Sequence, residues 1–187
     1  MDQIGLLKSI ATTGYNVGFG AKKHFATYDI VEKAPGWIGF ISSAVGVLAL
    51  IHDPLSAKLP SAILIILGIC TFYINPYKSE DYEIEGRKLL KIYAELRDLY
   101  YDVKPGADFD KSQEKLKNLE NIFYQTGISR QILFSDWFAH YKFFEQQQIS
   151  WIDDELKFTW KDKFPFSLRV FSTFSVIALV LLAIKTV

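Results

Sequence analysis

The hydrophobic positions of this chain form long uninterrupted runs in its first half and near its end. No charged residue occurs in 36–51, in 59–75 or in 170–183. A helix needs about 17 to 25 apolar residues to cross about 30 Å of hydrocarbon, so each run is at the short end of a membrane-spanning helix. A short joint that contains Pro54 and Pro60 separates the first two runs, which is typical of a tight hairpin.

A buried helix of a soluble core is the alternative interpretation of any single run, and the presence of three runs weakens it. We therefore predict two spans, at about 36–52 and 59–75, and a third span within 165–187. A cleavable signal peptide is not indicated, because the first apolar run starts only after about 35 residues. These segments are expected to remain in the mature protein.

The composition leaves room for a helical part outside the membrane. The chain has 187 residues, of which 50% are hydrophobic, and its formal net charge is zero. Three spans would take about 55 to 60 residues. Zero net charge argues against bulk attraction to nucleic acid, although it can conceal a local basic patch. The single cysteine, Cys70, lies in the second run, so neither a disulfide framework nor a thiol metal cluster is expected.

Helical spacing is found on both sides of the predicted hairpin. Residues 1–34 are predicted to be an amphipathic lead-in, bent because Gly14, Gly18 and Gly20 weaken a continuous helix. Residues 76–164 are predicted to be a helical bundle. Its first helix has a coiled-coil-like seam, which must pack on later helices or on neighbouring subunits; the seam consists of Leu89, Ile92, Leu96, Leu99 and Val103.

Two further helices are predicted in the bundle. Asp110 is a plausible N-cap for one of them, which buries Leu116 and Leu119 and ends at Gly127. The other covers 129–148 and has a broad aromatic face. The stretch 149–165 mixes aromatic and charged residues beside the third run and is expected at headgroup level. The predicted fold class is all-α, with a transmembrane hairpin at 35–75, a cytoplasmic bundle at 76–164 and a third transmembrane helix at 165–187.

Basic residues indicate the orientation of the hairpin. Short loops rich in Lys and Arg stay in the cytoplasm. The tip carries only Lys58, whereas Lys8, Lys22, Lys23 and Lys33 precede the hairpin and most other basic residues follow it. The N-terminus and the bundle are therefore predicted to be cytoplasmic, and the chain to be a multi-pass protein that ends outside at Thr186 and Val187.

Motifs for chemistry are weak. The stretch "GYNVGFGAKKHF" resembles a phosphate loop, but it lacks Gly-Lys-Ser/Thr and a preceding strand. The histidines, His24, His52 and His140, lack the close spacing of metal ligands on one helix. The acidic stretches "SEDYEIE" and "WIDDEL" are more typical of solvated faces than of catalytic carboxylates. No catalytic residue, metal or cofactor is therefore expected, and the protein is predicted not to be an enzyme.

Small residues in the apolar runs allow two interpretations. They can pack one span closely against its hairpin partner, or they can line a polar path between subunits. A single span cannot make a conducting path, so any pore would need several chains. We expect a homo-oligomer, with a tetramer as the working assumption; the residues are Gly39, Ser42, Ser43, Gly46, Ser61, Gly68 and Thr71.

A basic and aromatic cluster is the candidate ligand site. Basic groups can neutralise phosphates while an aromatic ring stacks on a base, which suits a nucleotide or a short single-stranded oligonucleotide. The alternative, which weighs more, is that these cations hold lipid headgroups and pair with the interleaved acidic residues. The cluster consists of Lys22, Lys23, His24, Arg87, Lys88, Lys91 and Tyr101.

The order of these parts resembles the SLATT domain family of bacterial two-span effectors. The resemblance is carried by "AKKHFATYDIV", the tight hairpin, and "YKSEDYEIEGRKLLKIYAELRDL", over about residues 15–105. It implies a non-enzymatic membrane effector of anti-phage conflict systems in the bacterial inner membrane. It also implies a nucleotide signal, often made by a partner nucleotidyltransferase, and a pore that arrests or kills the host.

Two functions are consistent with the sequence. The first is a homo-oligomeric pore in the lipid bilayer, gated by a nucleotide or oligonucleotide. The alternative is a non-conducting membrane scaffold, in which the aromatic helices between 118 and 144 dock a soluble partner. Ion flux from the purified protein would distinguish the two functions.

Overall fold

The computed structural model describes residues 2–185, and its regular secondary structure over that range is entirely helical. This confirms the predicted all-α fold class. The helices are α1 (Gln3–Ala49), α2 (Lys58–Ile74), α3 (Ser79–Val103), α4 (Phe109–Tyr124), α5 (Ser135–Gln146), α6 (Ser150–Leu156), α7 (Trp160–Lys163) and α8 (Phe166–Lys185), with a 3-10 turn, η1 (Asp53–Ser56), between α1 and α2.

The bundle is built on the antiparallel pair α1 and α3. The Gln3 side chain, at the start of α1, donates a hydrogen bond of 2.7 Å to the carbonyl of Val103, at the end of α3. All five seam residues predicted in α3 are buried. Their main partner is α1, so the seam packs within the chain on the helix that precedes the hairpin, in addition to later helices.

The predicted bend at the glycines of the lead-in is wrong, because α1 runs without a break from Gln3 to Ala49. Gly14 and Gly18 instead permit close packing. A methyl group at Gly14 would overlap the indole of Trp151, and one at Gly18 would lie 2.7 Å from the Tyr93 ring. Glycine in a helix interior costs about 1 kcal/mol relative to alanine. Burial of the Trp151 and Tyr93 rings outweighs this cost.

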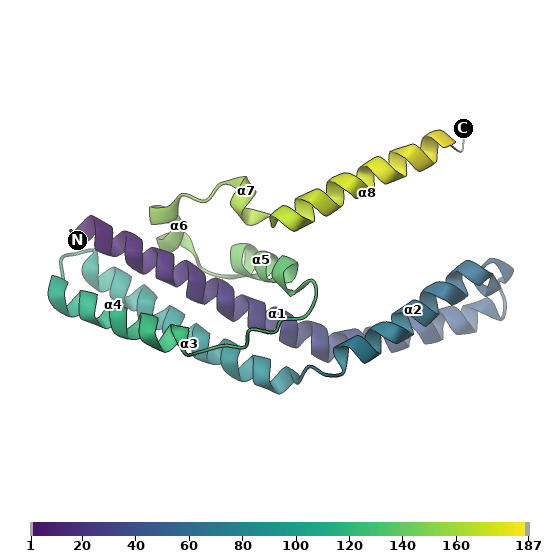
Figure 1. Cartoon of the computed structure of the whole chain (residues 1–187), viewed down its shortest axis with the longest axis horizontal. Helices are drawn as coiled ribbons and strands as arrows, with labels where there is room; N and C mark the ends of the chain where they lie inside the picture. The colour runs from purple at the N-terminus through teal and green to yellow at the C-terminus, as the bar shows by residue number, and fades with distance from the viewer. Residues whose placement is uncertain (1, 186–187) are drawn as a thin grey trace.

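The distal part of α1 leaves the bundle and pairs with α2 as a helical hairpin (Figure 1). Pro35 is the proline inside α1, and it lies where the helix passes from bundle to hairpin. Proline removes a backbone hydrogen bond and clashes with the preceding turn. This accounts for the change of direction that Figure 1 shows between the two parts of the helix.

The remaining helices cover the α1–α3 pair. α4 buries Leu116 and Leu119, as predicted, but its N-cap is Asp108 in place of Asp110; the Asp108 carboxylate accepts the Lys111 N–H at 3.2 Å. In the stretch 149–165, α6 inserts Trp151 into the core with only 1% of its surface exposed. The expectation of headgroup level is therefore wrong for Trp151.

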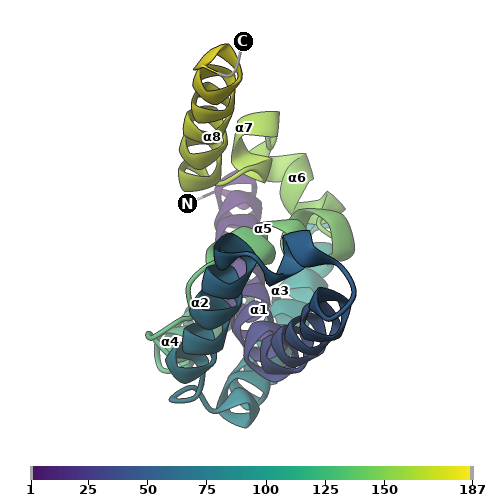
Figure 2. The same ribbon diagram turned by 90° about the vertical axis from the view of Figure 1, so that its right-hand side faces the viewer.

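The last helix, α8, extends away from the bundle toward the same side as the hairpin (Figure 1). Seen along that direction, α5 lies between the hairpin and α8 (Figure 2). The side of the bundle from which both projections emerge is called the hairpin side below. The predicted end of the third span, Thr186 and Val187, lies outside the described residues.

Candidate functional site

The hairpin exposes apolar side chains along most of its length. Leu50 is 83% exposed, Ile51 81% and Phe72 78%, and in α2 the only buried residue is Ile74, at the bundle end. A soluble monomer rarely shows a contiguous apolar patch of more than a few hundred Å². The exposed hairpin is therefore a surface that needs an apolar environment or a partner.

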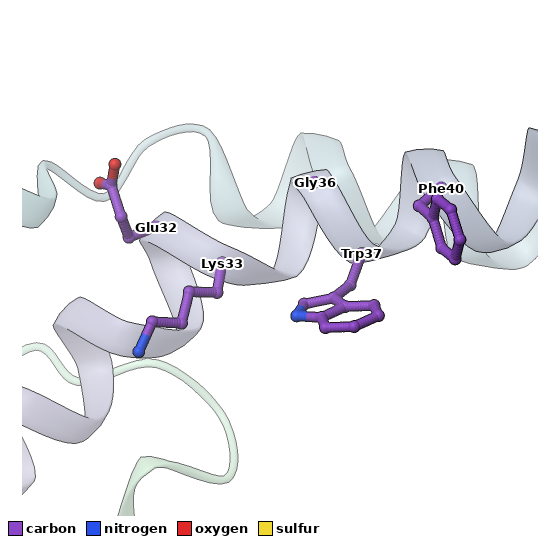
Figure 3. Close-up of a pocket in the computed structure, with 5 residues that line it drawn as sticks. All are labelled: Glu32, Lys33, Gly36, Trp37 and Phe40. Carbon is purple, nitrogen blue, oxygen red and sulfur yellow. The ribbon is translucent and has the colours of Figure 1, made fainter.

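The exposed apolar surface starts where α1 leaves the bundle. Figure 3 shows Trp37 and Phe40 projecting from one side of α1, with Lys33 at the bundle end of the same stretch. Together with Glu32 and Gly36 they line an open depression of about 440 Å³. All the residues that line it come from α1, and the Trp37 and Phe40 side chains are 63% and 67% exposed.

The helices meet the length and hydropathy requirements of a membrane span only in part. No single helix in the described range is long and apolar enough to cross a membrane by itself. The bent pair of α2 and α3, which meet at 62°, meets the requirement together, and 166–181 of α8 is a shorter apolar helix. The spans at about 36–52, 59–75 and 165–187 stay predictions.

The glycines in each helix of the hairpin are not packed against the other helix. A methyl group added at Gly39, Gly46 or Gly68 would meet no atom within 4 Å. Close approach inside one hairpin therefore does not explain them. The polar members bond locally, since the Ser61 hydroxyl donates to the Ala57 carbonyl at 3.1 Å and the Thr71 hydroxyl to that of Gly68 at 2.6 Å. Of the remaining two, Ser42 is half-buried and Ser43 is exposed.

Lys22, Lys23 and His24 lie beside the start of α3. A methyl group at Gly86 would lie 3.1 Å from the Phe25 ring, so α1 near residue 24 and α3 near residue 87 are adjacent. The two helix segments that carry the α1 and α3 members of the predicted ligand cluster are therefore neighbours. Tyr101 does not belong to this group, because it lies about 20 Å further along α3 at 1.5 Å per residue.

His24 has a structural role that the sequence did not reveal. Its side chain is 6% exposed. The ring Nδ1 bonds the Gly20 carbonyl at 2.8 Å, and Nε2 accepts the backbone N–H of Ile128 at 2.8 Å. Burial lowers the pKa of His24 and outweighs the Gly20 bond and the nearby Glu85, which raise it. Neutral His24 thus attaches the loop after α4 to α1.

The basic residues on α3 are mostly neutralised by local carboxylates. Arg87 pairs with Glu83 at 2.6 Å and Lys88 pairs with Glu85 at 2.7 Å. The hydrogen bond from Lys88 is the main cause that lowers the pKa of Glu85, which also accepts the Gly127 N–H. Exposed pairs of this kind contribute about 0 to 1 kcal/mol, so they can exchange partners when a phosphate approaches. Lys91 is exposed.

On α1, Lys22 and Lys23 differ in their surroundings. Lys23 pairs with Asp136 of α5 at 3.1 Å. Lys22 is half-buried, and burial, followed by repulsion from Lys142, lowers its pKa. Binding of an anion stabilises the charged form of a lysine that is held near a second cation more than it stabilises an exposed lysine. An anionic ligand would therefore stabilise charged Lys22 more than the exposed Lys91.

A buried ion pair near the hairpin was not predicted from the sequence. Lys142 of α5 bonds Asp29 of α1 at 2.5 Å, with 15% and 13% of the side chains exposed, and Lys33 bonds the same carboxylate at 2.5 Å. Burial alone would raise the pKa of Asp29, but the hydrogen bonds from Lys142 and Lys33 outweigh it and lower the pKa. The two partners are far apart in the chain, so no local pattern could reveal the pair.

The described residues contain no group of three or more His, Cys, Asp or Glu side chains placed to hold a metal ion. Within that range, the features that remain are an exposed apolar hairpin, a basic cluster at its bundle end and a second apolar projection, α8. This combination defines an all-helical protein whose bundle carries an apolar hairpin.

The chain belongs to the SLATT family. The family model described as "SMODS and SLOG-associating 2TM effector domain 6" matches residues 1–172, which confirms the resemblance inferred from the sequence. The name gives the domain two transmembrane segments, and the α1–α2 hairpin is the part of the chain that fits them. The protein is therefore a membrane effector by family. No curated protein and no solved structure matches the chain.

Proposed function

We propose that the protein is a homo-oligomeric pore or ion channel of a bacterial anti-phage defence system, which disrupts the inner membrane and arrests or kills the host. The observation that carries the proposal is the hairpin, whose apolar side chains are exposed and whose glycines meet nothing in their own chain. In a bilayer, helices associate through such small residues. Neighbouring copies would cover Gly39, Gly46 and Gly68 and enclose the path.

We further propose that a nucleotide or short oligonucleotide gates the pore. The family name associates these effectors with SMODS and SLOG domains, which supports a signal made by a partner nucleotidyltransferase. Lys22 and Lys91 are the cations we assign to the phosphates, since the other two lysines of the cluster, Lys23 and Lys88, are in ion pairs with Asp136 and Glu85. The cluster lies on α1 and α3, and α1 continues directly into the hairpin, so binding there can bias the hairpin.

The orientation follows from the basic residues. With the N-terminus and the bundle in the cytoplasm, the hairpin tip, which carries only Lys58, lies outside. A cytoplasmic bundle exposes the basic cluster to a signal made inside the cell. α8 would then cross outward as the third span.

Ion flux from liposomes that contain the purified protein tests this function. We expect flux that short single-stranded or cyclic oligonucleotides turn on or off. The triple charge reversal R87E/K88E/K91E should abolish this response, whereas K115E/K117E, an equally exposed reversal on α4, should leave it intact. Oligonucleotide-dependent flux that is equal in both variants would refute the assigned ligand cluster.

The scaffold function predicts a different result in the same assay. It is favoured by exposed apolar residues around α5, namely Leu133, Phe134 and Tyr141, which are 61%, 53% and 54% exposed. A scaffold would give no flux under any condition, although the protein is inserted in the membrane. That result would replace the pore with the scaffold as the proposed function.

A further inference from the structure

Two arginines without a carboxylate partner lie at the bundle ends of the two apolar projections. The Arg130 guanidinium stacks 4.7 Å from the centre of the Tyr77 ring, just after α2. The Arg169 guanidinium, at the start of α8, lies 5.6 Å from the Phe166 ring. Among the described residues, the arginines in ion pairs are Arg87 and Arg97. Arg130 is exposed on the hairpin side of the bundle, whereas Arg169 is half-buried, with a buried Nε that has no hydrogen-bond partner and a charge that also acts on Asp162.

A short apolar turn lies beside Arg130. Leu133 and Phe134 are 61% and 53% exposed, whereas Ile132 before them is buried at 4% and holds the turn in place. Phe134 has a φ of 67°, which is rare for a bulky residue. The strained backbone is fixed by the Ser135 N–H, which donates to the Ile132 carbonyl at 3.1 Å. The turn therefore presents two large apolar side chains to the surroundings.

An aromatic array joins this turn to α8. The Phe134 ring lies 4.9 Å from Trp137, which lies 5.5 Å from Phe171 of α8. The Trp137 indole N–H also donates to the Ser167 hydroxyl at 2.9 Å. A cleft of about 270 Å³ opens between α5 and the start of α8, lined in part by Trp137 and Leu168. The surface is thus continuous from the turn at Leu133 and Phe134 to α8.

We propose that this surface, formed by residues 130–141 and the start of α8, docks on anionic phospholipid at the membrane surface. The proposal rests on insertion of the hairpin and α8, which project toward the same side with α5 between them (Figures 1 and 2). Guanidinium groups match the geometry of phosphate, and aromatic side chains favour the headgroup level.

The proposed occupant is a lipid and not a free anion. A free phosphate would satisfy Arg130 and Arg169 but would leave Leu133 and Phe134 in water. A phospholipid satisfies both kinds of group at once, because its phosphate and its acyl chains meet at the depth where the hairpin emerges from the bundle. Docking would hold the bundle against the leaflet and fix its orientation to the pore.

Spin-label depth measurements test the docking in the reconstituted full-length chain. With Cys70 replaced by alanine, single cysteines are introduced by F134C, Y101C and F72C and labelled with a nitroxide. Phe134 and Tyr101 are 53% and 51% exposed, so they form a matched pair at opposite ends of the bundle. We expect the label at 134 to collide more with oxygen than with a water-soluble nickel complex, and the label at 101 to show the reverse.

The label at Phe72 separates the two levels of the proposal. If the label at 72 is lipid-accessible while that at 134 behaves like that at 101, the docking surface is refuted and hairpin insertion stands. If the label at 72 is itself in water, membrane insertion fails, and docking with it. The substitution F134N introduces asparagine, which tolerates a positive φ, so this variant should keep the fold. Its thermal stabilisation by anionic lipid should be weaker than that of the wild type.

Thermal unfolding in neutral detergent tests the lipid class. Added phosphatidylglycerol should raise the Tm of the wild-type chain by several degrees, whereas phosphatidylcholine and inorganic phosphate at the same concentration should not. The rise should be lost in R130Q/R169Q and kept in K115Q/K117Q, a double variant at two exposed cations of α4 that lie outside both the cluster and the docking surface. An equal rise in both double variants would overturn the assignment, and a rise with inorganic phosphate alone would show a free-anion site instead of a lipid site.

Discussion

Glycine is used in two different ways along α1. Gly14 and Gly18 lie against Trp151 and Tyr93, and there is no room for a side chain between them. Gly39 and Gly46, on the same helix, face open space. The same residue type thus allows close packing inside the bundle and remains available to other copies in the hairpin. The sequence presents the two sets alike, because the difference depends on partners far along the chain.

The substitution G14A should destabilise the bundle. Trp151 cannot easily shift, because it is 1% exposed and its indole N–H donates to the Tyr93 hydroxyl at 3.2 Å. Overpacking of this kind costs about 1 to 3 kcal/mol. Unfolding in detergent should show this loss for G14A and no loss for G46A. Equal stability of the two variants would contradict the packing described for Gly14.

His24 should make the stability of the bundle depend on pH. Burial lowers its pKa below the ordinary value of 6.5, so the unfolded chain binds the proton more tightly. The contribution of neutral His24 to the free energy of unfolding is complete above pH 6.5 and is lost as the pH falls through the lowered pKa of His24. Nearby Glu85 opposes the shift and Lys23 adds to it.

The measurement is the Tm between pH 7.5 and pH 5.5. Protonation of Nε2 would remove the bond from the Ile128 N–H, so the wild-type Tm should fall over this range. H24Q should lower the Tm at pH 7.5 and flatten the profile. Parallel profiles for the wild type and H24Q would mean that other groups cause the dependence.

The helix α3 shows what local periodicity can predict. The buried face of α3 was predicted correctly at every seam residue, because a spacing of three and four residues is a property of the helix itself. The partner was not predictable, because the glycines of α1 argued against a long helix there. Likewise the cap fell on Asp108 and not on Asp110, since the loop backbone decides between two nearby carboxylates.

Truncation of the seam should destabilise the α1–α3 pair. Leu96 is fully buried, whereas Leu90, on the other face of the same helix, is 36% exposed. L96A should reduce the free energy of unfolding by about 2 to 5 kcal/mol, and L90A by much less. Denaturant titration followed by circular dichroism measures both, and similar losses would show that α1 does not pack on this face.

The members of the predicted ligand cluster differ in where the fold places them. The helices that carry Arg87 and the residues 22–24 are adjacent at Gly86 and Phe25, but Lys23 pairs with α5 and Arg87 pairs along α3, so the ligand cluster stays a prediction. The sequence could not show that His24 is buried or that Tyr101 lies far away, since both depend on tertiary packing. Arg130 and Phe134 were placed in the helix predicted over 129–148, which is wrong for these positions, because α5 begins only at Ser135.

The whole molecule consists of a packed bundle and two apolar projections that the bundle does not cover. Phe40 and Ile65, in the two arms of the hairpin, are 67% and 65% exposed in the single chain. Protection of these positions from an aqueous reagent would therefore come from the membrane or from other copies, and not from the fold of one chain. This makes the topology of the hairpin directly testable.

Cysteine accessibility in native membranes is the most direct test. With C70A as background, F40C, I65C, S56C at the tip and K117C on α4 are treated with a membrane-impermeant maleimide in spheroplasts and in inverted vesicles. We predict that the cysteines at positions 40 and 65 react only after detergent is added. The cysteine at 56 should react from the outside, and the cysteine at 117 from the cytoplasmic side. Reaction of 40 and 65 in intact membranes as fast as 117, or of 56 and 117 from the same side, would contradict the membrane hairpin.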